Sequence, residues 1–170
     1  MNSENGSFVY INGKFFKASE ARISVFDHGL LYGDGVYEAV RVYNGKVFEL
    51  KKHLKRLFES AEGIDLSIPL TEEQMSDAIY ETLKLDHSSY PYVRILVTRG
   101  EGKMGVNPFN AKRPTTIIMI QNRPPEFRKG DKGLTAIIAS IRRMPQWALD
   151  PRVKTLNYLN NVLAGIEALR

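Results

Sequence analysis

The alternation of apolar and polar positions predicts two β-hairpins early in the chain. One spans residues 8–17 across the dipeptide Asn12-Gly13, and the other spans residues 36–50 across Asn44-Gly45. Asn-Gly readily adopts the positive backbone angles that a two-residue turn requires. In the strand at 36–43, valines and one glutamate alternate with Tyr37, Ala39, Arg41 and Tyr43. One face of this strand therefore carries aromatic rings and an arginine.

Three further segments are predicted as strands because they are rich in Val, Ile, Thr and Tyr and bounded by Gly or Pro: residues 90–99, 115–120 and 134–141. In the first of them, Val93, Ile95 and Val97 form a wholly apolar face. Since side chains alternate across a strand, Arg94 is expected to point the other way, into surroundings of mixed polarity.

Helical spacing of apolar residues predicts three helices. Residues 51–63 carry an apolar stripe that ends at Gly63, and a second stripe follows Thr71, which forms a capping-box pattern with Gln74. Residues 157–169 show the same periodicity. Together with the strands, these helices predict an α+β fold.

The order of these elements predicts two domains. Residues 1–122 are expected to form a small N-terminal domain with a mixed or antiparallel sheet and two helices. Paired prolines and a glycine interrupt every periodic pattern in residues 123–131, which we interpret as a linker. Residues 132–170 then begin a second domain.

Composition narrows the class of protein. Twenty-four Lys and Arg against 19 Asp and Glu give a net charge of +5, and the charges are interspersed, which favours a solvated surface over a nucleic-acid groove. No cysteine is present, and His28, His53 and His87 lack metal-ligand spacing, so no metal site is expected. No signal peptide or run of about 20 apolar residues is found, and we expect a cytoplasmic protein without membrane contacts.

Two stretches carry the clearest chemical signal. Residues 153–161 read Val-Lys-Thr-Leu-Asn-Tyr-Leu-Asn-Asn, and residues 27–38 read Asp-His-Gly-Leu-Leu-Tyr-Gly-Asp-Gly-Val-Tyr-Glu. Both resemble signature segments of the fold-type IV aminotransferases, which use pyridoxal 5'-phosphate, and weaker similarity extends from about Phe8 to Arg170. The resemblance implies that residues 132–170 begin the cofactor-binding domain and that Lys154 binds the cofactor covalently.

Transamination requires an amine that condenses with the cofactor aldehyde and later moves the substrate's α proton, and lysine suits both tasks. The resemblance further implies that the Tyr158 hydroxyl contacts the phenolic oxygen of the cofactor. If a helical turn begins near Thr155, Lys154 and Tyr158 share a face. Residues 53–57, His-Leu-Lys-Arg-Leu, are similar to the family segment that supplies a phosphate-binding arginine, which makes Arg56 the phosphate candidate.

The same resemblance implies a set of substrate-binding residues: Tyr32, Tyr37, Arg41, Arg94 and Val106. In branched-chain aminotransferases, the residue matching Arg94 meets the distal carboxylate of glutamate, and the residue matching Tyr32 comes from the partner subunit. The loop at 102–108 resembles the family loop that reaches across the dimer and carries Val106. A homodimer acting on an amino acid and a 2-oxo acid is therefore expected.

Residues 37–41, Tyr-Glu-Ala-Val-Arg, are most similar to the branched-chain enzymes, which transaminate branched-chain L-amino acids with 2-oxoglutarate. D-amino-acid aminotransferases are also similar here, but their Arg-x-His pair is replaced by Arg-Ile-Leu at 94–96. Aminodeoxychorismate lyase shares the lysine signature and is a further alternative. Family members continue beyond the position of Arg170, so we expect this chain alone to be impaired, and a noncatalytic truncated domain is the alternative of a different class.

Overall fold

The computed structural model describes residues 5–125 and 133–170, and it describes no side chains for residues 5–7. Its centre is a six-stranded sheet in the order β2-β1-β6-β5-β3-β4, in which every neighbouring pair is antiparallel. The strands are β1 (Asn5–Ile11), β2 (Lys14–Lys17), β3 (Gly35–Tyr43), β4 (Lys46–Val47), β5 (Pro91–Thr98) and β6 (Thr115–Asn122). The helices are α1 (His28–Tyr32), α2 (Leu50–Glu62), α3 (Glu72–Lys84), α4 (Leu159–Leu169) and the 3-10 turn η1 (Pro108–Asn110).

Both predicted hairpins are confirmed. Asn12 and Gly13 have φ of 48° and 87°, and Asn44 and Gly45 have φ of 49° and 75°, as their tight turns require. The second strand of the second hairpin was predicted over residues 46–50, but β4 contains only two residues. Glu49 adopts a left-handed φ of 48°, which ends the extended conformation, and α2 begins at the next residue.

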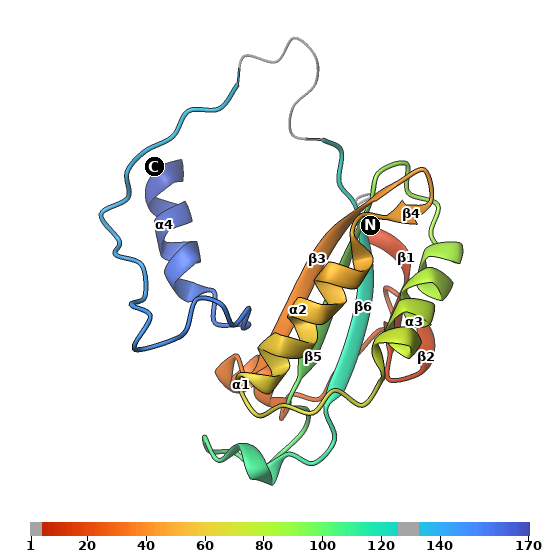
Figure 1. Cartoon of the computed structure of the whole chain (residues 1–170), viewed down its shortest axis with the longest axis horizontal. Coiled ribbons are helices and arrows are strands. Elements are labelled where there is room, and N and C mark those ends of the chain that lie inside the picture. Colours follow the sequence, from red (N-terminus) through yellow and green to blue (C-terminus); the bar gives the residue numbers. More distant parts are fainter. Residues whose placement is uncertain (1–4, 126–132) are drawn as a thin grey trace.

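The core lies between one face of the sheet and the helices α2 and α3, which cover it side by side (Figure 1). The apolar face predicted for β5 is confirmed, since Val93, Ile95 and Val97 are fully buried. The capping box at Thr71 is also confirmed: its Oγ1 accepts from the Gln74 amide at 3.1 Å, and the Gln74 side chain accepts from the Thr71 amide at 2.9 Å. The predicted α+β fold is therefore correct.

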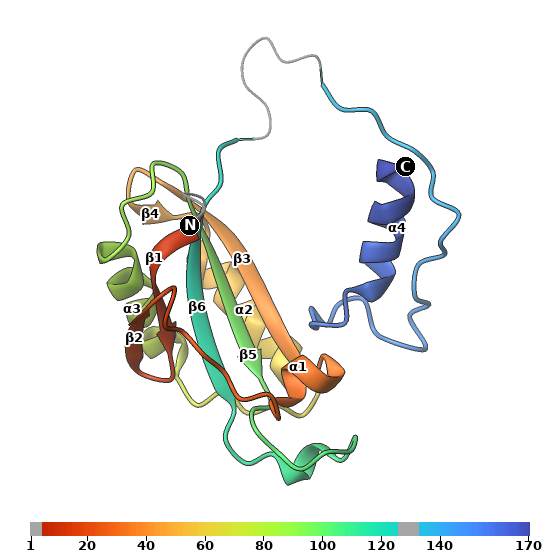
Figure 2. The ribbon, with the colours of Figure 1, turned by 180° about the vertical axis from the view of Figure 1, so that it is seen from behind.

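The opposite face of the sheet carries the aromatic and basic residues. Tyr37 pairs with Leu96, Ala39 with Arg94, and Arg41 with Tyr92 across β3 and β5. No long helix of the described residues packs on this face (Figure 2). Alternation along β3 thus separates a valine face, which α2 and α3 cover, from a face that these helices leave uncovered.

The prediction of a strand at 134–141 is wrong. These residues make no β-ladder in the described part of the chain, and most of their apolar side chains are exposed; Ile138 has 97% of its surface accessible. A strand requires a hydrogen-bonded neighbour, and no described segment lies alongside to provide one. The predicted helix at 157–169 is confirmed as α4.

The linker predicted at 123–131 lies largely outside the described residues, and the division into two domains stays a prediction. Among the residues that the structure describes, no helix is long and apolar enough to cross a membrane.

Candidate functional site

The segment that contains Lys154 is docked on the edge of β3. The Tyr37 amide donates to the Lys154 carbonyl at 3.1 Å, the Leu156 amide donates to the Gly35 carbonyl at 2.9 Å, and Thr155 forms a bridge with Val36. Residues 154–156 therefore act as a short additional strand next to the first half of β3. A Cβ at Gly35 would lie 2.6 Å from the Val97 carbonyl oxygen and 2.8 Å from the Leu156 side chain, so this close approach requires glycine.

Helix α2 provides a second anchor for the lysine segment. The Lys154 amide donates to Ser60 Oγ at 3.1 Å, and Ser60 has only 1% of its surface exposed. At the end of the same helix, a Cβ at Gly63 would lie 2.8 Å from a methyl group of Val153. The backbone of Lys154 is thus held between a strand edge and a helix.

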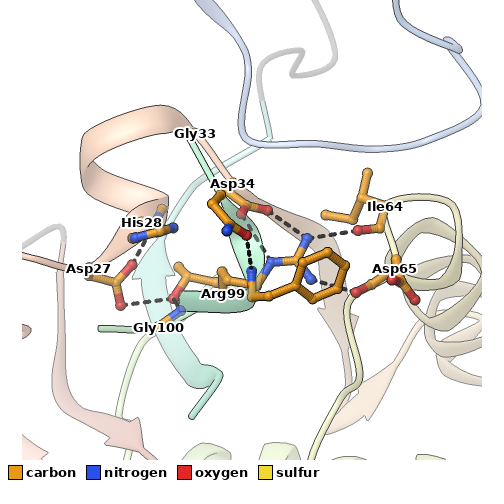
Figure 3. Close-up of polar contacts among 12 residues, drawn as sticks. Asp27, His28, Gly33, Asp34, Ile64, Asp65, Arg99 and Gly100 are labelled. Atoms are coloured by element: carbon orange, nitrogen blue, oxygen red, sulfur yellow. Dashed lines mark hydrogen bonds and ion pairs between the residues drawn. The ribbon is translucent and has the colours of Figure 1, made fainter. Parts of the chain in front are cut away.

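A buried arginine holds the turn on which this segment docks (Figure 3). Arg99 pairs with both carboxylate oxygens of Asp34 at 3.0 Å and donates to the carbonyls of Ile64 and Asp65. In Figure 3 the guanidinium lies between Asp34 and the loop after α2. The neighbouring Gly33 carbonyl accepts from the Asn157 side chain at 3.1 Å. Arg99 therefore fixes the turn at 33–35 relative to α2.

The Lys154 amine lies over the Tyr37 ring and near the Tyr158 ring. Its Nζ is 4.1 Å from the centre of the Tyr37 ring and 6.0 Å from that of Tyr158, and the two rings meet edge to face at 5.3 Å. The guanidinium of Arg94 lies 5.5 Å from the Tyr37 ring. Four predicted site residues from three separate segments are thus brought together.

The lysine, Tyr158 and Arg56 also line one pocket of about 800 Å³. Its remaining wall comes from the segments before and after the lysine, including Arg143 and Asn161. Because Arg56 projects from α2 and Lys154 from the docked segment, an amine and a guanidinium face the same space. A second pocket, of about 650 Å³, contains Arg22 and Lys103 but none of these three residues.

Glu38 is a site residue that the sequence analysis missed. Its carboxylate is fully buried, accepts from Nε and Nη2 of Arg56, the latter at 2.9 Å, and lies 2.9 Å from Nδ1 of His53. The signal was present, because Glu38 interrupts the apolar face formed by Val36 and Val40. Ser60 and Arg99 were missed as well, and no local pattern distinguishes them from ordinary surface residues.

Two pKa shifts follow from these contacts. Burial of the carboxyl acts to raise the pKa of Glu38, but hydrogen bonds from Arg56 and His53 outweigh it and hold that pKa below its usual range. A hydrogen bond with Tyr37 raises the pKa of Tyr158 and burial adds to this, while the charge of Lys154 acts in the opposite direction. The Tyr158 hydroxyl therefore stays protonated at neutral pH.

Three predicted residues lie away from the lysine pocket. The Tyr32 hydroxyl accepts from the Gly105 amide at 2.6 Å, and Val106 on the same loop is 85% exposed. Arg41 donates to the Arg123 carbonyl and stacks 5.5 Å from the Tyr92 ring. Arg41 shares a strand face with Tyr37, but four residues of strand separate the two by about 13 Å.

The helical turn that was expected to bring Lys154 and Tyr158 onto one face is not present. Residues 154–157 are not helical, because their backbone pairs with β3, and α4 begins at Leu159. The two side chains still meet, through the bend between the docked segment and the helix.

We expect Ser60→Ala to loosen the lysine segment. The substitution leaves the Lys154 amide without its acceptor, which should lower the free energy of unfolding by about 1 kcal/mol and accelerate hydrogen exchange of that amide. Denaturant unfolding and amide exchange measure the two effects. Ser67→Ala, at an exposed serine, is the matched control, and equal exchange of the Lys154 amide in both variants would contradict this anchor.

The depressed pKa of Glu38 predicts a dependence of stability on pH. Because the unfolded state takes up the proton first, at a pKa of about 4.3, the contribution of Glu38 is complete above that value and is lost as the pH falls through the lower folded pKa. Glu38→Gln should be less stable than the wild type at pH 7, and the gap should narrow in acid. Unfolding at several pH values tests this, with the exposed Glu62→Gln as control.

Comparison with known proteins identifies the family to which the chain belongs. The family model of amino-transferase class IV matches residues 35–170. A Methanocaldococcus jannaschii protein, provisionally named a branched-chain-amino-acid aminotransferase, is 48% identical over 94% of this chain and 55% of its own length. The D-alanine aminotransferase of Staphylococcus haemolyticus is 32% identical over 95% of this chain and 56% of its own.

Among solved structures, the T.th. branched-chain amino acid aminotransferase with pyridoxamine 5'-phosphate superimposes with a TM-score of 0.89 at 30% identity. The match covers 96% of this chain and 56% of that one. The chain thus spans about half the length of the proteins it resembles. Since the family model covers most of its residues, the chain belongs to the class IV aminotransferase family.

Proposed function

We propose that this chain carries the lysine and phosphate site of an aminotransferase that uses pyridoxal 5'-phosphate to transaminate branched-chain L-amino acids with 2-oxoglutarate. The observation that carries the proposal is the convergence on one pocket of an amine, a phenol and a guanidinium, from Lys154, Tyr158 and Arg56. These are the groups that would bind an aldehyde, a phenolic oxygen and a phosphate.

The residues present fit pyridoxal 5'-phosphate. Arg56 offers a planar cation for the phosphate, and the Tyr158 hydroxyl, whose raised pKa keeps it protonated, offers a hydrogen bond to the phenolic oxygen. The Tyr37 ring, against which the lysine rests, supplies an apolar wall. When bound, the cofactor supplies a reactive aldehyde and a ring that stores electrons.

Within that site, the Lys154 amine would hold the aldehyde carbon of the cofactor, and it would also be the base that takes the proton from the substrate's α carbon. Its backbone bonds to Tyr37 and Ser60 keep the attachment point still while the side chain moves between these tasks. Arg94, beside Tyr37, is the candidate for the substrate carboxylate, and its described contacts include an aromatic ring but no acidic side chain.

The positions of Tyr32 and Val106 support a homodimer in which each serves the partner's site. Both lie outside the lysine pocket of their own chain, and the bond between Tyr32 and Gly105 joins them into one surface. Exposed apolar side chains surround this surface, including Leu30 at 61%, Met104 at 74% and Phe109 at 74%. Contact with a second copy would remove that apolar surface from water.

Covalent labelling tests the lysine. The chain is mixed with pyridoxal 5'-phosphate, its visible absorbance is recorded, and the adduct is reduced with borohydride and mapped by peptide mass spectrometry. We expect a single label on Lys154, lost in Lys154→Ala and kept in Lys112→Ala, at an exposed lysine. Labels scattered over surface lysines, or none, would overturn the proposed function.

The substrate class is tested with the loaded protein. Adding L-leucine or L-glutamate should shift the visible absorbance of the cofactor as the amino group is transferred, at the reduced rate expected of this chain alone. D-alanine should leave the absorbance unchanged, because residues 94–96 lack the Arg-x-His pair. Arg94→Gln should weaken the response to L-glutamate more than the response to L-leucine. A response to D-alanine alone would replace the branched-chain assignment by the D-specific one.

A further inference from the structure

The contacts of Arg56 are divided between a buried carboxylate and an open pocket. Glu38 lies on the face of β3 that packs against α2, and its side chain has no exposed surface. Burying a carboxylate among valines is costly unless charged donors surround it. Arg56 supplies two N–H groups from one turn of α2, and His53 supplies a third donor from the turn before it.

Among the residues that the structure describes, only Glu38 accepts hydrogen bonds from the Arg56 guanidinium. An arginine has five N–H groups in one plane. Glu38 takes the Nε hydrogen and one on Nη2, which leaves three: both on Nη1 and the second on Nη2. These define the outer edge of the guanidinium. The Arg56 side chain is 51% exposed and lines the lysine pocket, so this edge belongs to the accessible half of the group.

We propose that Glu38 is a positioning residue. It fixes the plane of the Arg56 guanidinium, so that the N–H groups on the outer edge are already oriented to bind the phosphate of the cofactor. This inference rests on the proposed function, and it adds a residue that touches neither cofactor nor substrate. A free arginine on a helix surface would lose rotamer entropy on binding phosphate. With its inner edge already bound, Arg56 has lost that freedom beforehand, and binding costs less.

The partners of Glu38 explain why a carboxylate serves here. A neutral amide would offer one acceptor oxygen to a cation that presents two donors, whereas the carboxylate accepts both with charge assistance. His53 Nδ1 binds the same oxygen as Arg56 Nη2 and prevents the carboxylate from rotating. The negative charge also balances one of the cations that line the pocket, among them Arg56 and Lys154.

The test compares two aldehydes that differ only in the phosphate. Apparent dissociation constants of pyridoxal 5'-phosphate and of pyridoxal are measured from the visible absorbance for the wild type, Glu38→Gln, Arg56→Ala and the double variant. We expect Glu38→Gln to weaken binding of the phosphorylated form about tenfold and to leave pyridoxal unchanged. In the Arg56→Ala background, Glu38→Gln should have no further effect. The proposal would be overturned if Glu38→Gln weakened the binding of both aldehydes equally, or if it weakened binding as much in the Arg56→Ala background as in the wild type.

Two further measurements cover the case in which Glu38→Gln fails to fold. Arg56→Lys changes an exposed side chain and keeps the charge, but an ammonium cannot bind a carboxylate with one edge and a phosphate with the other. This variant should therefore lose nearly as much of the preference for pyridoxal 5'-phosphate over pyridoxal as Arg56→Ala does. Nitrogen-15 NMR of the chain without cofactor should show a slowly exchanging Arg56 Nε–H that shifts when inorganic phosphate is added.

These readouts separate the two proposals. A wild type that forms no adduct with Lys154 overturns the proposed function, and the Arg56 Nε–H signal still decides whether Glu38 holds the guanidinium. A rapidly exchanging Nε–H, or full phosphate preference in Arg56→Lys, overturns the positioning role while the proposed function stands.

Discussion

Backbone pairing between residues 154–156 and the edge of β3 is the interaction on which the site depends. Two hydrogen bonds, which make up the bridge between Val36 and Thr155, place Lys154 opposite Tyr37 although the two are far apart in the sequence. Such bonds do not depend on side-chain rotamers, so they define where the lysine begins while its amine stays free to move. Gly35 permits this pairing, since any side chain there would strike the Val97 carbonyl oxygen. The ion pair between Arg99 and Asp34 holds the turn in which Gly35 lies (Figure 3).

Helix α2 is the second rigid element of the site. Arg56 and Ser60 are four residues apart, about 6 Å along the helix axis, so the pocket guanidinium and the anchor of the lysine backbone move as one body. Glu38 joins that helix to β3, the strand that holds Lys154. The positions of the amine and of the guanidinium are thus set by the packing of one strand and one helix, which is the kind of scaffold that preorganised sites require.

The chain carries an exposed apolar surface away from the lysine. Tyr32 and the loop of Val106 are joined by a hydrogen bond, and their surroundings are apolar and exposed. If the proposed dimer forms, one chain contributes the lysine side of a site and the other contributes this surface. The division explains why the predicted substrate residues fall into separate groups within a single copy, with Tyr37 and Arg94 near the lysine and Tyr32 away from it.

The sequence by itself determined the hairpins, the two core helices and the apolar face of β5, because turn dipeptides and local periodicity encode these elements directly. Family resemblance singled out Lys154, Tyr158 and Arg56. Only the tertiary structure decided that residues 134–141 form no strand, since pairing depends on a neighbour that periodicity does not reveal. It also decided the contacts of Glu38, Ser60 and Arg99, whose partners lie 18, 94 and 65 positions away. A residue's chemistry can be read locally, but its contacts exist only after distant segments pack together.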